Sequence, residues 1–285
     1  MLTFDYSDKT FKSALSGFKK IKRTPEDALW KGKEHLFFYN GKTALHYLVN
    51  EYKLGRNDEI CIFTSTDKNY VSTCVSGTIF NYCKLSRVIT KYTKMLYIIH
   101  EFGIPHPETK KIVKKGKKLG IPVVEDCAHL IDVNSGKERI GNYGDYALYS
   151  LSKHFPIAHG GLLVGKKIKA DKVFYNKKEA AFLNKKFNEY VGYLGALSQK
   201  RRELYTELKK IAMKKKYPYY KFSDTMSPFY FIMETPRYKE INEKLEGYGI
   251  LMGRTYIKNM VAVPITPLLD SGYKKEMLKK LISVL

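Results

Sequence analysis

Short apolar runs rich in β-branched and aromatic residues alternate with helix-period segments through the first two thirds of the chain. The runs predict strands at 36–39, 59–64, 95–100, 122–125, 146–150 and 162–165. Between them, apolar residues recur at helical spacing over 43–53, 71–82 and 107–119. This alternation predicts an α/β domain with a mostly parallel sheet flanked by helices, in which ligands bind where strands end and helices begin.

The pattern changes near residue 170. A long Lys- and Glu-rich helix is expected over about 177–214, followed by a strand in SPFYFIM and a helix at 237–246. A short strand in MVAVP and a C-terminal helix complete the chain. The sequence therefore predicts two domains, a large one over 1–170 and a region over 171–285 that contains the long helix and a small C-terminal α+β lobe.

The charge adds one unusual property, because 51 Lys and Arg residues outnumber 28 Asp and Glu residues and give a net charge of +23. Such an excess attracts anions. Much of it lies in short Lys runs spaced like the solvent faces of helices, and no standard nucleic-acid motif is present, so nucleic acid is not an expected partner. No signal peptide or apolar run of roughly 18 residues is visible, which predicts a cytoplasmic protein that does not enter the membrane.

The cysteines give no sign of a disulfide framework or a metal centre. Cys61, Cys74, Cys83 and Cys127 lie far apart, without a C-x-x-C pair or a histidine at zinc-ligand spacing. We expect reduced, mostly buried thiols and no metal site.

The candidate chemistry gathers at the ends of two predicted strands. The strand IPVVED ends in Glu125 and Asp126, and His129 follows three residues later. The strand at 146–150 ends at Ser150 and is followed by Lys153, with a Gly-Gly pair further on. An acid and an amine are therefore presented at the ends of two strands of one sheet.

These segments resemble the DegT/DnrJ/StrS family of sugar aminotransferases, which depend on pyridoxal phosphate (PLP). The similarity covers about residues 36–165, and KRRELYTELKK resembles a helix of the family's second lobe more weakly. The matching motifs are EDCAH, GNYGD, YSLSK, HGG, YNGKTALHYL and IIHEFG. The resemblance implies the fold-type-I PLP transferase fold and a homodimer.

The resemblance also assigns roles to residues. It implies that Lys153 holds PLP as an aldimine and then moves the proton at the substrate α-carbon. Asp126 would contact the pyridine nitrogen and His129 the phenolic oxygen. A strand-end helix cap is the ordinary role of such an aspartate, and a core position is that of a lone histidine.

The remaining implied contacts lie around the phosphate and the ring. Ser150 matches a phosphate-binding serine. Gly41, Lys42 and Thr43 begin a helix whose N-terminal amides suit the same phosphate. Tyr70 falls where the family has an aromatic residue that stacks on the ring, although a core tyrosine is an equal alternative.

The chain departs from the family at several points. Ser150 and Lys153 are spaced more closely than usual, Lys42 replaces threonine, and His154 replaces the asparagine after the lysine. Some members have histidine in place of the lysine and dehydrate sugars. Counting back from Gly160 puts Lys153 at that position, which favours aminotransfer.

We therefore expect an aminotransferase that moves an amino group from an amino-acid donor such as glutamate to a keto sugar, in particular a nucleotide-linked one. The chain is short for the family, and this keeps two alternatives open. One is a PLP-fold binding or regulatory protein without efficient turnover. The other is a PLP enzyme that acts on a non-sugar substrate.

Overall fold

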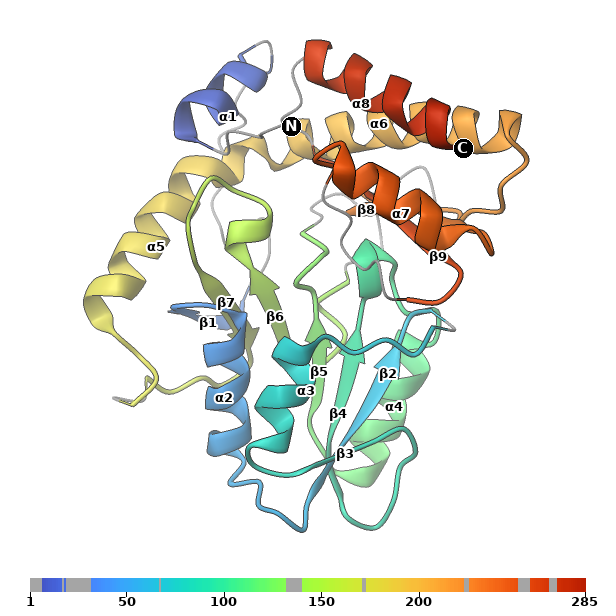
Figure 1. Cartoon of the computed structure of the whole chain (residues 1–285). Helices are drawn as coiled ribbons and strands as arrows, with labels where there is room; N and C mark the ends of the chain where they lie inside the picture. The colour runs from blue at the N-terminus through green and yellow to red at the C-terminus, as the bar shows by residue number, and fades with distance from the viewer. Residues whose placement is uncertain are drawn as a thin grey trace. The chain divides into compact units, whose positions relative to one another are not determined.

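A computed structural model describes residues 7–16, 18, 32–66, 68–131, 140–170, 173–222, 226–250, 257–266 and 271–285 (Figure 1). The chain forms two compact units, one of Ile21–Gly192 and one of Met1–Lys20 with Tyr193–Leu285. The boundary predicted after residue 170 lies inside the first of these units and remains a prediction.

A seven-stranded sheet forms the centre of the Ile21–Gly192 unit, with the strand order β1-β7-β6-β5-β4-β2-β3. The strands are β1 (Glu34–Phe38), β2 (Glu59–Thr64), β3 (Lys84–Ser86), β4 (Thr93–Ile99), β5 (Val123–Asp126), β6 (Tyr146–Ser150) and β7 (Gly161–Gly165). Strands β2 to β6 pair in parallel, whereas β7 runs antiparallel to both β6 and β1. The prediction of a mostly parallel α/β sheet is confirmed.

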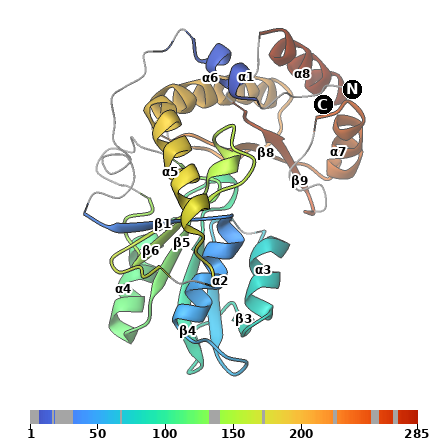
Figure 2. The ribbon, with the colours of Figure 1, turned by 90° about the vertical axis from the view of Figure 1, so that its left-hand side faces the viewer.

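Helices cover both faces of this sheet (Figure 2). On one face, α2 (Gly41–Glu51) and α3 (Thr73–Phe80) pack against Tyr97 and Val124. On the other face, α4 (Thr109–Leu119) packs against Ile98 and Val123. Because side chains alternate along a strand, successive residues of β4 and β5 enter these two different cores.

Helix α4 shows how the charged sequence accommodates a core. Its residues Ile112 and Val113 are buried against the sheet, while its lysines are exposed. Gly116 is buried as well, and a Cβ there would lie 2.3 Å from a Val123 methyl group, so the close packing of α4 on β5 requires glycine. The Lys runs of this helix are solvent-facing, as the spacing predicts.

The prediction of one continuous helix over about 177–214 is wrong. The segment divides into α5 (Lys177–Tyr190), the 3-10 turn η4 (Val191–Tyr193) and α6 (Leu194–Lys214). The break contains Gly192, and glycine weakens a helix interior because its backbone loses more entropy on ordering. Before the break, Phe187 of α5 packs on Phe37 of β1 and on Phe155.

The other unit combines helices with a small antiparallel sheet, in agreement with the predicted α+β lobe. Strands β8 (Tyr230–Glu234) and β9 (Met260–Pro264) form the sheet. It packs with α6, α7 (Tyr238–Gly247) and α8 (Ser271–Val284), through residues such as Leu208, Ile241 and Leu281. A short helix, α1 (Asp8–Ala14), is not predicted by the sequence pattern and begins at the Ser7 cap.

Within the described part of the chain, no helix combines the length and the apolar character needed to cross a membrane.

Candidate active site

The predicted acid and amine lie at the same edge of the sheet. Asp126 is the last residue of β5 and Ser150 the last of β6, and these two strands are parallel neighbours. Lys153 follows Ser150 in the 3-10 turn η3 (Leu151–Lys153). Because the carboxyl ends of parallel strands meet at one edge, the sheet topology brings the candidate residues together.

Lys153 and His129 are in direct contact. The Lys153 Nζ atom lies 2.9 Å from His129 Nε2, in a partly buried position. Two basic groups at this distance share a proton, so one acts as the donor and the other as the acceptor. The contact joins the turn after β5 to the turn after β6.

Asp126 is 5% exposed and its carboxylate is held at both oxygens. The Tyr97 hydroxyl donates to Oδ2 at 2.9 Å, and the Ala128 N–H donates to Oδ1 at 3.0 Å. Burial, and next the charge of Asp126, raise the pKa of Tyr97 well above its usual value, so the phenol stays protonated and remains a donor. The Ala128 bond also shapes the turn that leads to His129.

The N-terminus of α2 supplies backbone donors. Asn40 is the N-cap residue, and its Oδ1 accepts from the Thr43 N–H at 2.9 Å and the Thr43 hydroxyl at 3.1 Å. Thr43 therefore contributes to the cap of its own helix. The N–H groups of Gly41 and Lys42 precede it at the positive end of the helix dipole, where anions bind favourably.

Gly161 connects this helix end to the end of β6. It pairs with Ser150 across the β6–β7 ladder. A Cβ at Gly161 would lie 2.3 Å from the carbonyl carbon and oxygen of Asn40 and 2.7 Å from the Gly41 nitrogen. Only glycine allows this approach, which brings the Ser150 end of β6 towards the N-terminus of α2.

Three rings form a stack beside the site. Phe102 lies 6.4 Å from Tyr70 and 6.4 Å from His129, with interplanar angles of 24° and 15°. Phe102 is buried and has a φ of +58°, in the left-handed region that a bulky residue rarely adopts. Tyr70 and His129 are predicted from the sequence but Phe102 is not, because its only signal is its place in the IIHEFG motif.

Glu125 is fully buried and faces away from Asp126. Its oxygens accept from the N–H groups of Gly141, Tyr143 and Gly144 at 2.7–2.8 Å. Burial raises the pKa of this carboxyl, but His100 and these backbone donors outweigh burial, so the pKa is lowered overall. The sequence marks Glu125 as a strand-end acid without a role.

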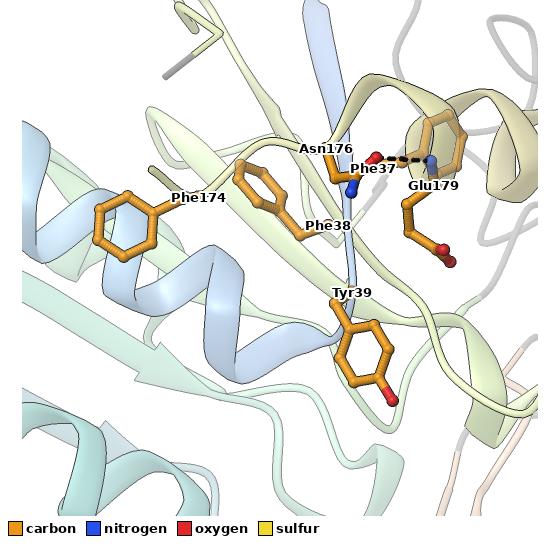
Figure 3. A pocket seen from close by; sticks show the side chains of 6 residues that line it. All are labelled: Phe37, Phe38, Tyr39, Phe174, Asn176 and Glu179. Atoms are coloured by element: carbon orange, nitrogen blue, oxygen red, sulfur yellow. Dashed lines mark hydrogen bonds between the residues drawn. The ribbon is translucent and has the colours of Figure 1, made fainter. Parts of the chain in front are cut away.

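A cavity of about 200 Å³ lies near the start of α2, lined by Phe37, Phe38, Tyr39, Phe174, Asn176 and Glu179 (Figure 3). Tyr39 stacks on His159 at 4.4 Å, and His159 bonds to Glu179. Neither Lys153 nor Asp126 lines this cavity.

Among the residues that the structure describes, no group of three or more His, Cys, Asp or Glu side chains could hold a metal ion. Within the same residues, the cysteines carry free thiols, buried at Cys61, Cys83 and Cys127 and exposed at Cys74.

Solved structures share this fold. An aminotransferase named TlmJ from Streptoalloteichus hindustanus superposes with a TM-score of 0.72 at 11% identity, over 99% of this chain and 91% of that one. A DegT DnrJ EryC1 StrS aminotransferase from Brucella abortus also gives 0.72, at 12% identity over 99% of both chains. Identities this low bear on the fold alone.

Curated proteins match over shorter stretches. GDP-perosamine synthase from Vibrio cholerae is 24% identical over 171 residues, which cover 54% of this chain and 46% of that protein. UDP-N-acetyl-3-dehydro-alpha-D-glucosamine 3-aminotransferase from Acidithiobacillus ferrooxidans is 27% identical over 106 residues, or 36% of this chain and 27% of that protein. The matches thus span less than half the length of these two relatives.

The family model for DegT/DnrJ/EryC1/StrS aminotransferases matches residues 31–198, a segment that contains every candidate site residue. That segment is more than half of the 285 residues. The chain therefore belongs to the DegT/DnrJ/EryC1/StrS aminotransferase family.

Proposed function

We propose that this protein is a PLP-dependent aminotransferase that transfers an amino group from an amino-acid donor such as glutamate to a keto sugar, in particular a nucleotide-linked one. The observation that carries the proposal is the Lys153–His129 contact at the same sheet edge as Asp126. Family membership and the names of the two curated relatives, which are nucleotide-sugar enzymes, support the same class of reaction.

The donor set fits PLP chemically. A primary amine suits an aldehyde, a buried carboxylate suits a pyridinium nitrogen, and a helix N-terminus suits a phosphate. Lys153, Asp126 and the amides of Gly41 and Lys42 are the respective groups. When bound, PLP would supply an electron sink for the charge that develops at the substrate α-carbon.

The protein's own residues would position the reactants and move protons. Lys153 Nζ would accept the proton from the substrate α-carbon and return it on the other side of the transfer. His129, 2.9 Å from this amine, would keep it oriented between proton transfers. Asp126 would hold the ring nitrogen protonated, with the Tyr97 hydroxyl and the Ala128 N–H fixing its carboxylate.

The phosphate contacts would anchor the group at its other end. Gly41 and Lys42 offer backbone donors, and the exposed Lys42 side chain adds positive charge. Ser150 is the N-cap residue of η3, its side chain makes no capping hydrogen bond there, and its hydroxyl would donate to a phosphate oxygen. Thr43 would act through the Asn40 cap, and Tyr70 through the ring stack.

The homodimer and the cytoplasmic location that we expect from the sequence belong to this proposal. The net charge of +23 suits a diphosphate-linked substrate.

The first test is a visible absorption spectrum of the purified protein with saturating PLP, recorded for the wild type and for Lys153→Ala. The expected result in the wild type is a visible band that borohydride removes while the reduced cofactor stays covalently attached to the protein. Both the band and the attachment should be missing in the variant. Labelled glutamate and a panel of nucleotide keto sugars would then identify the acceptor. A wild type without any band would contradict the proposal and favour a binding protein that keeps the fold.

A further inference from the structure

Glu125 and Asp126 are consecutive residues of β5 whose side chains lie on opposite faces of the sheet. Asp126 bonds to Tyr97, which belongs to the core under α2 and α3. The Glu125 side chain is fully buried on the face that α4 covers. Interactions that hold the Glu125 side chain therefore also hold the backbone next to Asp126.

The first attachment of Glu125 is to the turn before β6. Its Oε1 accepts from the N–H groups of Tyr143 and Gly144 at 2.8 and 2.7 Å, and its Oε2 accepts from Gly141 at 2.8 Å. A buried carboxylate without such donors would be strongly unfavourable. Strand β6 starts shortly after this turn and delivers Ser150 and Lys153 to the site.

The second attachment is to His100. The His100 Nε2 atom lies 3.4 Å from Glu125 Oε2, with both side chains inaccessible to solvent. The other ring nitrogen, Nδ1, accepts from the His106 N–H at 3.0 Å, which leaves the ring proton on Nε2, facing the carboxylate. The His100 N–H also donates to the Asp126 carbonyl at 3.2 Å.

His100 leads directly into the ring stack. It is the N-cap residue of the 3-10 turn η2 (Glu101–Gly103), which contains Phe102. Phe102 stacks between Tyr70 and His129, and His129 contacts Lys153. Glu125 is therefore connected to Lys153 by two routes, one through the turn before β6 and one through His100.

We propose that Glu125 is a positioning residue that sets the relative placement of Asp126, the Phe102 ring and Lys153 without contacting cofactor or substrate itself. The inference rests on the proposed function for its catalytic meaning. The placement of these residues by Glu125 can be tested on the cofactor-free protein.

The substitution Glu125→Gln separates positioning from simple loss of volume. Glutamine keeps the size of the side chain, and its oxygen can still accept from Tyr143 and Gly144. Its NH₂ group would face the Gly141 N–H and the His100 Nε2–H, so donors meet donors on the side that leads to the ring stack. Glu59→Gln is the control, because Glu59 is likewise a carboxylate of a strand in the same sheet, β2, and accepts from the Thr90 hydroxyl at 2.5 Å.

The cofactor-free proteins are compared first by hydrogen exchange. Glu125→Gln is expected to speed amide exchange by about tenfold or more in peptides covering 100–104 and 126–131, beyond the directly bonded 141–144 turn. Glu59→Gln should leave these peptides unchanged. Acceleration confined to 141–144 would overturn the proposal, since Glu125 would then stabilise only its own turn.

PLP binding supplies the second readout. We expect Glu125→Gln to raise the Kd for PLP by about tenfold or more, as loss of an outer supporting residue does at other sites, and to shift the pH midpoint of the visible band. A wild-type Kd and midpoint in Glu125→Gln would contradict positioning, even if its Tm falls. Absence of PLP binding in the wild type would refute the proposed function, while the exchange experiment would still decide the placement of the residues.

If Glu125→Gln does not fold, His100→Ala tests the second route alone, because the donors of Gly141, Tyr143 and Gly144 then keep their acceptor. Faster exchange in peptides covering 126–131 is expected. Unchanged exchange there would overturn the proposal.

Discussion

The amine of Lys153 lies 2.9 Å from Nε2 of His129, although His129 follows β5 and Lys153 follows β6. His129 is also the last ring of the stack that begins at Tyr70. The orientation of this histidine is therefore fixed from one side by aromatic packing and from the other by the lysine. Removing its ring nitrogens should disturb the orientation of the Lys153 amine more than it lowers the stability of the fold.

His129→Leu is accordingly expected to lower kcat by about 100-fold, because Lys153 would lose the partner that orients it and a positioned proton-transfer group contributes on that scale. Steady-state kinetics with saturating donor would measure it. His46→Leu is a suitable control, because the His46 ring also lies within hydrogen-bond distance of a polar side-chain atom, Tyr82 Oη at 3.1 Å, outside the site. Equal kcat losses in the two variants would argue that His129 has no special role.

Asp126→Asn should reduce kcat by at least about 100-fold while leaving the protein folded. Asparagine fits the same space and still accepts one bond, but it cannot hold a pyridinium charge. Single-turnover rates and the Tm together would check this. Asp58→Asn, which changes a partly exposed aspartate just before β2 that accepts from the Gly55 N–H, should leave the rate at its wild-type value. A nearly normal rate in Asp126→Asn would remove Asp126 from the site.

Gly161→Ala should destabilise the protein and weaken PLP binding. The added methyl group would lie 2.3 Å from the Asn40 carbonyl group, and backbone cannot move aside as a flexible side chain can. Thermal unfolding and a PLP titration would measure both effects.

Gly77→Ala provides the contrast, because nothing lies within 4 Å of a Cβ at this helical position. This variant should gain about 0.5–1 kcal/mol from reduced backbone entropy in the unfolded chain. A Tm for Gly161→Ala equal to that of Gly77→Ala would contradict the close approach between β7 and α2.

Acid should weaken the fold through Glu125. Its pKa is lowered in the folded protein, so its stabilisation is fully present above the usual value of 4.5 and is lost as pH falls through the folded value. Urea unfolding between pH 7 and pH 3 would show this loss in the wild type.

The difference in unfolding free energy between the wild type and Glu125→Gln should be about 3 kcal/mol at pH 7 and shrink towards pH 3, because removing one partner of a buried charged network is costly only while the charge exists. A difference that is constant with pH would exclude a role for the ionised carboxylate.

Much of the fold follows from the sequence because the parallel strands are continuous apolar runs. The predicted bounds of β2 and β6 agree with the observed ones, Asp126 ends β5, and Lys153 lies in the turn that follows β6. The three-residue strand β3, KLS, lacks this signal because it is short and partly polar. It forms through pairing with β2, which is a tertiary effect.

The site is predicted less completely than the sheet. Residue types and motifs indicate Lys153, Asp126 and His129, but the ring stack depends on the left-handed conformation of Phe102, which no local pattern shows. The role of Asn40 as a helix cap is visible in principle, since Asn is a preferred N-cap residue. Glu125 looks like any strand-end acid until its three backbone donors are seen.

The two antiparallel pairings of β7 also bear on the order in which the chain assembles. Strand β1 is at the edge of the sheet and pairs with β7, whose residues lie far later in the sequence. Contacts between distant segments generally form after local ones, so the parallel strands β2 to β6 can associate while β1 has no place to dock. During synthesis, β1 would then pair only after the ribosome has released β7, and cofactor binding would follow the completion of this unit.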